Sequence, residues 1–180
     1  MDSALCMRRL DGRSDEDLAA LVTRGEAQSF AILAERYRVK AMRIAYGILH
    51  NRSDAEDVVQ DAFIRIYRNL AKFRGLRFSS WLYKIVVNES LRFRRTRRET
   101  SDEIEPSGSV DIEQIMLVRK CLASLPETYQ TVLALRGIEE LSYEEIAEIL
   151  GLPVGTVRSR LHEGRRSFAK CWKELMSGEE

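Results

Sequence analysis

Residues 141–161 of this chain read Leu141-Ser-Tyr-Glu-Glu-Ile-Ala-Glu-Ile-Leu-Gly-Leu-Pro-Val-Gly-Thr-Val-Arg-Ser-Arg-Leu161. Ser142 and Glu145 have the spacing of a capping box, which satisfies the free backbone N–H groups at the start of a helix. Gly151 can adopt the left-handed conformation that ends that helix, and Pro153 suits the first turn of the next one. The segment therefore predicts a helix, a tight turn and a second helix.

The second predicted helix has one apolar side and one polar side. Val154, Val157, Leu161 and Phe168 recur at helical spacing, so we expect them to face inward. A polar and basic outer face is typical of the helix of a helix-turn-helix that enters the major groove of DNA. An ordinary helical hairpin with a solvated, charged face is the alternative. The outer face consists of Thr156, Ser159 and His162, with Arg158 and Arg160 at its flanks.

Charge is strongly segregated along the 180 residues, although the formal net charge is only +1. Residues 65–98 carry eleven Lys and Arg against one acid, and residues 153–173 carry six against one. Acidic blocks precede and separate these two basic segments. This pattern indicates nucleic acid on some faces and a protein partner on others, because a non-specific DNA coater is usually basic overall.

Sequence patterns for catalysis, metal binding and export are missing. The three cysteines are isolated and odd in number, which favours cytosolic thiols over a zinc site or disulfides. The two histidines, His50 and His162, fall in different predicted domains, and no phosphate-binding glycine loop occurs. No apolar run reaches the length of a membrane span, and no signal peptide opens the chain. We expect a cytoplasmic protein without membrane insertion, not an enzyme, with no catalytic residue, cofactor or metal.

Apolar periodicity is helical almost throughout, so the predicted fold is all-α, with two small helical domains. A polar, acidic segment interrupted by Pro106 and Gly108 would be the flexible linker between them. The predicted division is a loose tail at 1–13, a first domain at 14–98, the linker at 99–111, and a helix-turn-helix domain at 112–176. The predicted helices are approximately 15–25, 27–50, 53–70, 80–98, 112–124, 127–138, 142–150 and 154–175.

The predicted helix from Ser53 carries an acidic stripe opposite its apolar face. Ser53 and Glu56 form a second candidate capping box. Asp54, Asp57 and Asp61 align on the outer side, and Ile64 lies within this stripe with no core to enter. An exposed hydrophobic residue among carboxylates fits a protein-docking site. A solvated helix face with one stray isoleucine fits the pattern equally well.

A basic loop followed by an aromatic-bearing helix occupies residues 73–95. Ser79 or Ser80 would cap this helix, and its outer face would present Trp81, Lys84, Asn88, Arg92 and Arg95. Aromatic rings that stack on bases and cations that follow phosphates suit unpaired DNA. Alternatively, Trp81 is a core anchor and the arginines form a solvated tail.

Several of these segments together resemble a bacterial RNA polymerase sigma factor. The matching motifs appear in the expected order and are Asp54-Ala-Glu-Asp-Val-Val-Gln-Asp-Ala-Phe63, Phe78-Ser-Ser-Trp-Leu-Tyr-Lys-Ile85 with Asn88, Leu125-Pro-Glu, Tyr143-Glu-Glu-Ile-Ala147 and Gly155-Thr-Val-Arg-Ser-Arg-Leu161. The compact form is similar to the extracytoplasmic-function (ECF) group of the sigma-70 family, over about residues 15–175. The resemblance implies a non-catalytic subunit that binds core RNA polymerase and promoter DNA, commonly silenced by an anti-sigma factor.

The resemblance also implies a role for each surface. The docking face for core polymerase would comprise Asp54, Asp57, Gln60, Asp61 and Ile64. The melted −10 strand would be bound by Lys72, Arg77, Ser79, Ser80, Trp81, Lys84, Asn88, Arg92 and Arg95. The −35 duplex would be read by Thr156, Arg158, Ser159, Arg160, His162, Glu163 and Arg165. The acidic linker would pass through a polymerase channel that normally holds nucleic acid.

Two positions depart from the family pattern. Glu163 stands where the family often has a basic residue, and a carboxylate there would repel phosphate but accept a hydrogen bond from a cytosine amine. Arg92 stands where an acid is frequent, which adds positive charge near the −10 strand. The alternative function is a dimeric helix-turn-helix transcription regulator that acts without being a polymerase subunit.

Overall fold

The computed structural model describes residues 12–74, 77–98 and 112–177, and within these ranges every regular element is a helix. The predicted all-α fold is thus confirmed. Most of the predicted tail and the whole predicted linker lie outside the described residues. The elements are α2 (Asp15–Thr23), α3 (Ala27–Leu49), α4 (Arg52–Asn69), the 3-10 turn η1 (Leu70–Lys72), α5 (Phe78–Arg98), α6 (Ile112–Ala123), α7 (Glu127–Glu139), α8 (Tyr143–Leu150) and α9 (Val154–Ser177).

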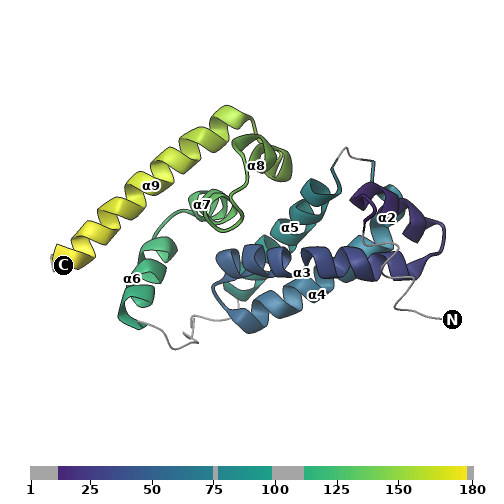
Figure 1. The fold of residues 1–180 in the computed structure, drawn as a ribbon. Coiled ribbons are helices and arrows are strands. Elements are labelled where there is room, and N and C mark those ends of the chain that lie inside the picture. Colours follow the sequence, from purple (N-terminus) through teal and green to yellow (C-terminus); the bar gives the residue numbers. More distant parts are fainter. Residues whose placement is uncertain (1–11, 75–76, 99–111, 178–180) are drawn as a thin grey trace.

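Helix α3 is the centre of the N-terminal half, because α2, α4 and α5 all pack against it. Figure 1 shows this group of helices, with α3 and α4 running side by side. Ala41, Ile44 and Ala45 of α3 are fully buried, and the small alanines let the neighbouring helices approach closely. The apolar face predicted for the next helix is buried here as Ala55, Val58 and Ile66 of α4.

The C-terminal half is built on the packing of α9 against α7. Val157 and Leu161 of α9 are buried, as are Val132 and Leu135 of α7. Gly164 is also buried, and a Cβ atom there would lie only 3.2 Å from Cδ1 of Leu133. The missing side chain therefore permits the close approach of the two helices.

Both predicted ends of α8 are confirmed, whereas the predicted start of α4 is wrong. The capping box of Ser142 and Glu145 is formed in both directions, and Gly151 ends α8 with a φ of 65°. By contrast, α4 begins at Arg52. Its cap is Asn51, two residues before Ser53, and the side chain of Asn51 accepts a hydrogen bond from the backbone N–H of Asp54 at 3.1 Å. Ser53 is already inside the helix, so it forms no capping box with Glu56.

Helix α5 begins earlier than the sequence predicted. Phe78 is its first residue, which places Ser79 and Ser80 in the first turn instead of at the cap. The backbone N–H of Phe78 donates to the carboxylate of Glu16 on α2 at 3.2 Å. A side chain from a distant helix thus satisfies one of the free N–H groups at this helix start.

The two halves contact each other directly, as Figure 1 shows for α7 beside α3. Arg94 of α5 lies at the centre of this contact and is 9% exposed. Its guanidinium donates to the Ile48 carbonyl at 3.1 Å and to Gln130 at 2.8 Å, and it pairs with Glu127 at 3.1 Å. Among the described helices, none combines the length and apolar character needed to cross a membrane.

Candidate protein and nucleic-acid interfaces

The acidic face of α4 is exposed, with one exception among the predicted residues. Asp57, Gln60 and Asp61 are exposed, and Ile64 is 42% exposed although it is a large hydrophobic residue. Asp54 differs, because it forms an ion pair with Arg97 of α5 and its side chain is only 16% exposed. The structure therefore brings Asp57, Gln60, Asp61 and Ile64 together on one open face, and it assigns Asp54 to packing between α4 and α5.

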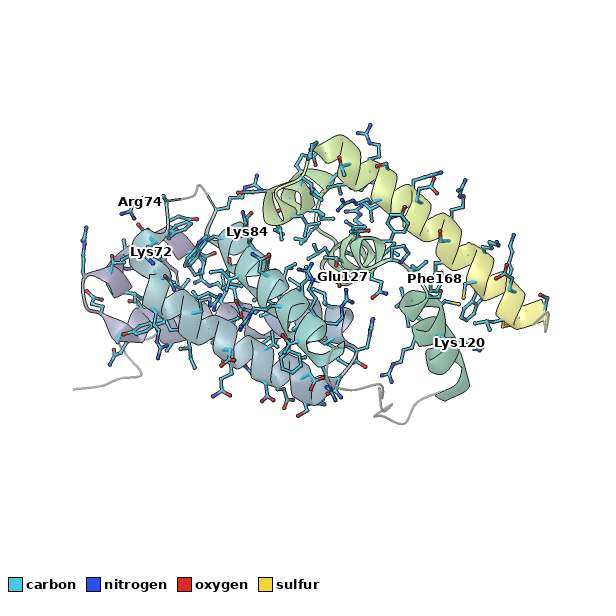
Figure 2. The ribbon with its side chains drawn as sticks, turned by 180° about the vertical axis from the view of Figure 1, so that it is seen from behind. Lys72, Arg74, Lys84, Lys120, Glu127 and Phe168 are labelled. Carbon is cyan, nitrogen blue, oxygen red and sulfur yellow. The ribbon has the colours of Figure 1, made fainter. Side chains whose placement is uncertain are left out.

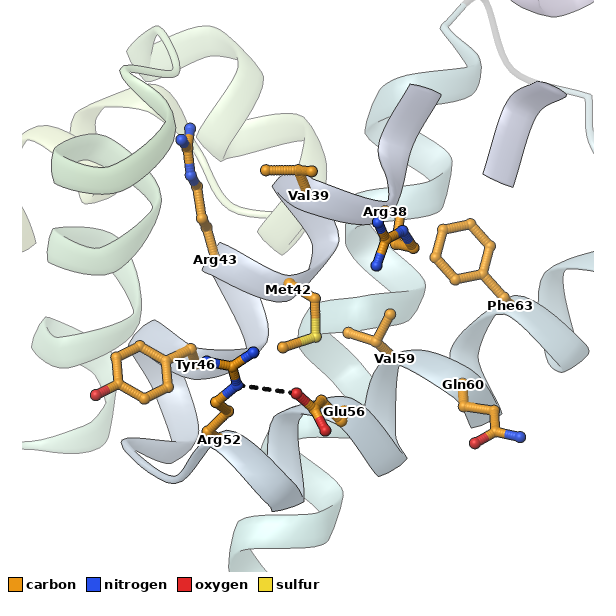
Figure 3. Close-up of a pocket in the computed structure, with 10 residues that line it drawn as sticks. All are labelled: Arg38, Val39, Met42, Arg43, Tyr46, Arg52, Glu56, Val59, Gln60 and Phe63. Atoms are coloured by element: carbon orange, nitrogen blue, oxygen red, sulfur yellow. Dashed lines mark hydrogen bonds and ion pairs between the residues drawn. The ribbon is translucent and has the colours of Figure 1, made fainter. Parts of the chain in front are cut away.

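A pocket of about 710 Å³ lies beside this face, between α3 and α4. Figure 3 shows Val39 and Met42 approaching it from α3, and Val59 and Phe63 from α4. Val39 is 52% exposed, which is unusual for a large aliphatic side chain. Gln60 lines the pocket and also belongs to the acidic face, so the two features form one continuous surface.

Phe63 lies on the apolar side of α4 and is half-buried, and the sequence pattern of α3 does not single out Val39 or Met42. Their positions on α3, three residues apart, put them on the same side of that helix. Many core residues of α3 have the same spacing, so the sequence does not show which apolar side chains stay exposed. The packing of α4 against α3 decides this. Arg52 and Glu56 close one side of the pocket with an ion pair of 3.0 Å.

Trp81 occupies an aromatic cluster at the start of α5. Its ring lies 5.4 Å from that of Phe73 and 5.9 Å from that of Phe78, and the side chain is half-buried. Trp81 is thus partly a core anchor, with part of its surface left for a partner. Figure 2 shows Lys72 at the end of η1, Arg74 just after it, and Lys84 on α5. Lys72, Lys84 and Asn88 are exposed, as predicted for a cationic face.

Residues at the first turn of α5 contact the C-terminal half. Ser80 is 5% exposed, and its hydroxyl donates to the carboxylate of Glu148 on α8 at 2.8 Å. Arg77 pairs with Glu145 of α8 at 3.3 Å. Ser79 is half-buried. Two of the groups predicted to bind DNA are therefore bound to carboxylates within the chain, which sequence spacing could not indicate.

The two arginines at the far end of the same face also have acidic partners. Arg92 pairs with Glu89 at 2.7 Å, and Arg65 also pairs with this buried glutamate. Arg95 pairs with Glu127 of α7 at 3.2 Å. Figure 2 shows Glu127 where the two halves of the molecule meet. Burial acts to raise the pKa of Glu127, but Arg94 and then Arg95 outweigh it, so its pKa lies below the usual value.

Helix α9 presents the predicted outer face to solvent. Arg158, Ser159, His162 and Arg165 are exposed, while Thr156, Arg160 and Glu163 are half-buried. On the inner side, Val157 and Leu161 are buried, and Val154 and Phe168 are half-buried. Glu163 pairs with Arg166 at 2.8 Å, so its carboxylate faces a cation one turn further along α9. This partner reduces the negative charge that Glu163 would present to DNA.

His50 and the two described cysteines lie away from these faces. His50 ends α3 with a φ of 57°, and burial, followed by Arg94 and Arg119, lowers its pKa to about 4. Cys121 is fully buried and Cys171 half-buried, and neither forms a disulfide. Within the described residues, no group of three or more His, Cys, Asp or Glu side chains could hold a metal ion.

Two family matches cover most of the chain. The family described as Sigma-70 region 2 matches residues 33–100, and that described as Sigma-70, region 4 matches residues 115–168. The first match contains α4 and α5, with the acidic face and the aromatic cluster. The second contains the helix-turn-helix of α8 and α9.

Whole-chain relatives agree with these matches. The chain is 34% identical over 176 residues to the ECF RNA polymerase sigma factor SigW of Bacillus subtilis, covering 86% of this chain and 94% of that protein. It is 35% identical over 177 residues to the ECF RNA polymerase sigma-E factor of Escherichia coli K12, covering 86% and 92%.

Solved structures show the same similarity. CnrH, in complex with the cytosolic domain of CnrY, matches with a TM-score of 0.70 and 26% identity over 92% of this chain and 99% of that one. The sigma factor RpoE of Bartonella quintana, in complex with the anti-sigma factor NepR, matches with a TM-score of 0.62 and 26% identity over 78% and 96%.

Proposed function

Because the chain belongs to the ECF sigma factors of the sigma-70 family, the promoter-recognition subunits of RNA polymerase, we propose that three of its surfaces divide this function. The observation that carries the proposal is that three distinct faces lie on separate helices. The acidic and apolar face of α4 and the basic face of α9 are largely exposed, and the aromatic and basic face of α5 exposes Lys84 and Asn88. Residues 14–98 would form the first domain and residues 112–176 the second, joined by the linker at 99–111.

The surface of α4 would dock on the coiled coil of the largest polymerase subunit. Asp57, Gln60, Asp61 and Ile64 are its exposed contacts, and the pocket lined by Val39 and Phe63 extends it. An exposed apolar patch bordered by charged residues is the usual form of a protein-binding site. Asp54 would support this surface through its ion pair with Arg97, without contacting the polymerase itself.

The start of α5 would bind the melted −10 strand. Trp81 is half-buried, so part of its ring is left for stacking with an unpaired base, while Lys72 and Lys84 follow the phosphates. Arg77, Ser79, Ser80 and Asn88 would complete the site. Arg92 and Arg95 would contribute less than their charge suggests, because Glu89 and Glu127 already neutralise them.

The N-terminal part of α9 would read the −35 element as duplex DNA in the major groove. Arg158, Ser159, His162 and Arg165 are exposed and ready for contact, with Thr156, Arg160 and Glu163 beside them. The chain itself would have no catalytic role and no cofactor, and it would act in the cytoplasm. An anti-sigma factor would be a further partner, since the similar structure of RpoE contains the anti-sigma factor NepR.

Transcription by core RNA polymerase with and without this protein tests the proposal. DNA fragments from the region upstream of its own gene serve as templates. Specific transcripts that appear only after addition of the protein are the expected result. Tight binding to palindromic duplex DNA without any association with polymerase would replace the proposal with the dimeric regulator.

A further inference from the structure

We propose that the free chain silences its own −10 surface, because helix α8 occupies the start of α5 with carboxylates that stand in for DNA phosphates. This inference rests on the proposed role of α5 in binding the −10 strand. Ser80 and Arg77 are the two DNA-contact candidates engaged at this place, by Glu148 at 2.8 Å and by Glu145 at 3.3 Å. A DNA strand and α8 would compete for the same hydroxyl and the same guanidinium.

The chemistry of the contact is that of a phosphate site. A hydroxyl and a guanidinium are common donors to phosphate oxygens, and each here donates to a carboxylate oxygen instead. Glu145 is held ionised, since the backbone N–H of Ser142 lowers its pKa and Arg77 lowers it further, against the effect of burial. The negative charge of α8 therefore faces the basic half of the molecule.

A second set of contacts positions α8 for this role. At the other end of α5, Arg94 and Arg95 pair with Glu127 of α7, and Arg94 also donates to Gln130. On α3, the hydroxyl of Tyr46 accepts a hydrogen bond from Arg119 of α6. Helix α7 thus lies against α3 and α5, and α8 follows it directly along the chain. The closed arrangement is maintained at several points, of which the α8 contact is the one that covers the −10 surface.

The closed form affects the two DNA-binding surfaces differently. Arg158, Ser159 and His162 of α9 remain exposed, so the −35 surface is open in this arrangement. Ser80, by contrast, is almost completely buried. Because α8 covers the start of α5, binding of both promoter elements at once requires the two halves of the chain to part. The −10 surface would then be covered in the closed form of the chain and exposed in the extended form.

The test removes the two carboxylates of α8 without disturbing its fold. In the variant Glu145→Gln/Glu148→Ala, glutamine keeps the capping box, and Glu148 lies on the exposed side of α8. The control Glu140→Gln/Glu144→Gln changes the net charge equally, at two exposed acids that do not contact α5 through an ion pair in the described part of the chain. Small-angle scattering measures the opening, and fluorescence anisotropy measures binding to a short, labelled single strand of mixed-sequence DNA and to its duplex.

We expect the α8 variant to have a larger radius of gyration than the wild type and about tenfold tighter single-strand binding, because two weak competing contacts are removed. Duplex binding should change no more than in the control. Equal compactness and equal single-strand binding in the variant and the control would overturn the inference. If the variant opens but its single-strand affinity stays unchanged, the start of α5 is not the DNA site, and the proposed −10 assignment fails with it.

If the double variant does not fold, Glu148→Ala alone serves the same test, since Glu148 takes no part in the capping box. It removes the acceptor of the Ser80 hydroxyl and leaves the pair of Arg77 and Glu145 in place. A smaller gain in single-strand affinity, of about threefold, is then expected from the loss of one contact. No gain over Glu144→Gln would overturn the inference.

Discussion

Glu16 of α2 accepts a hydrogen bond from the backbone N–H of Phe78, the first residue of α5, at 3.2 Å. Sixty-two positions separate these residues in the sequence. A carboxylate at a helix N-terminus is favourable because it satisfies a free N–H group and meets the positive end of the helix dipole. The beginning of the proposed −10 surface is therefore held by a residue outside the matched region 2.

Replacing Glu16 with alanine should lower the free energy of unfolding by about 1 kcal/mol, as loss of a helix cap does. Glu16→Gln keeps a carbonyl oxygen at the same place, so its loss should be smaller. Urea unfolding of both variants measures the difference. Equal losses in the two variants would mean that the charge alone, and not the hydrogen bond, stabilises this end.

Reversing the charge of Asp57 and Asp61 together, as Asp57→Arg/Asp61→Arg, should abolish binding to core RNA polymerase. Both side chains are exposed, so the fold should tolerate the change, and binding to −35 duplex DNA should remain. Glu26→Arg, an exposed acid before α3, is the control. Co-elution with core polymerase provides the measurement, and unchanged affinity in the double variant would refute the docking face.

Arg160→Ala should cost about 1–3 kcal/mol at the preferred −35 sequence if its guanidinium contacts a base edge. The same loss on every duplex sequence would reassign the contact to phosphate, with a smaller dependence of affinity on salt. Competition binding with matched and mutated −35 duplexes distinguishes the two cases. Arg166→Ala is a useful comparison, because that guanidinium pairs with Glu163 on the same helix.

Stability should fall as the pH decreases from about 6.5 to about 4, in part because of His50. Burial, and then Arg94 and Arg119, lower its pKa in the folded chain to about 4. The unfolded chain therefore binds a proton in this range that the folded chain does not, at a cost of at most about 3 kcal/mol. His50→Asn, which suits the left-handed backbone, should show a smaller fall in urea unfolding across the same pH range. Parallel curves for the two proteins would contradict this assignment.

Cys121 should resist alkylation in the folded protein. Burial, with the hydrogen bond to Cys171, raises the pKa of its thiol to about 11, so the reactive thiolate is scarce near neutral pH. Cys171 is half-buried and should be modified first by iodoacetamide. Mass spectrometry of peptides from folded and urea-unfolded protein measures this order. Equally fast modification of Cys121 in the folded chain would show that this part of the core opens readily.

Local features of this chain were predictable from neighbouring residues alone. The capping box of Ser142 and Glu145, and the helix end at Gly151, depend on contacts within one turn, and both form as predicted. The cap at Ser53 was wrong because Asn51 competes for the same role two residues earlier. A capping pattern therefore locates a helix start to within a few residues but does not choose between adjacent candidates.

Contacts between distant segments could not be predicted in this way. The side chains of Ser80 and Glu148, or of Arg95 and Glu127, are charged or polar and would be assigned to solvent by any local pattern. They meet only because α7 packs on α3 and brings α8 to the start of α5. The same holds for Val39 and Phe63, whose apolar spacing predicts burial until the shape of the neighbouring helix is known.

The two tryptophans of the chain, Trp81 and Trp172, fall in different halves of the molecule. Trp81 lies against Phe73 and Phe78, while Trp172 stacks on Phe168 at 6.2 Å. Replacing either one leaves a single tryptophan, whose emission reports on its own half. Two denaturation curves recorded in this way measure cooperativity between the halves, because independently melting units give different midpoints and a tightly coupled pair gives one.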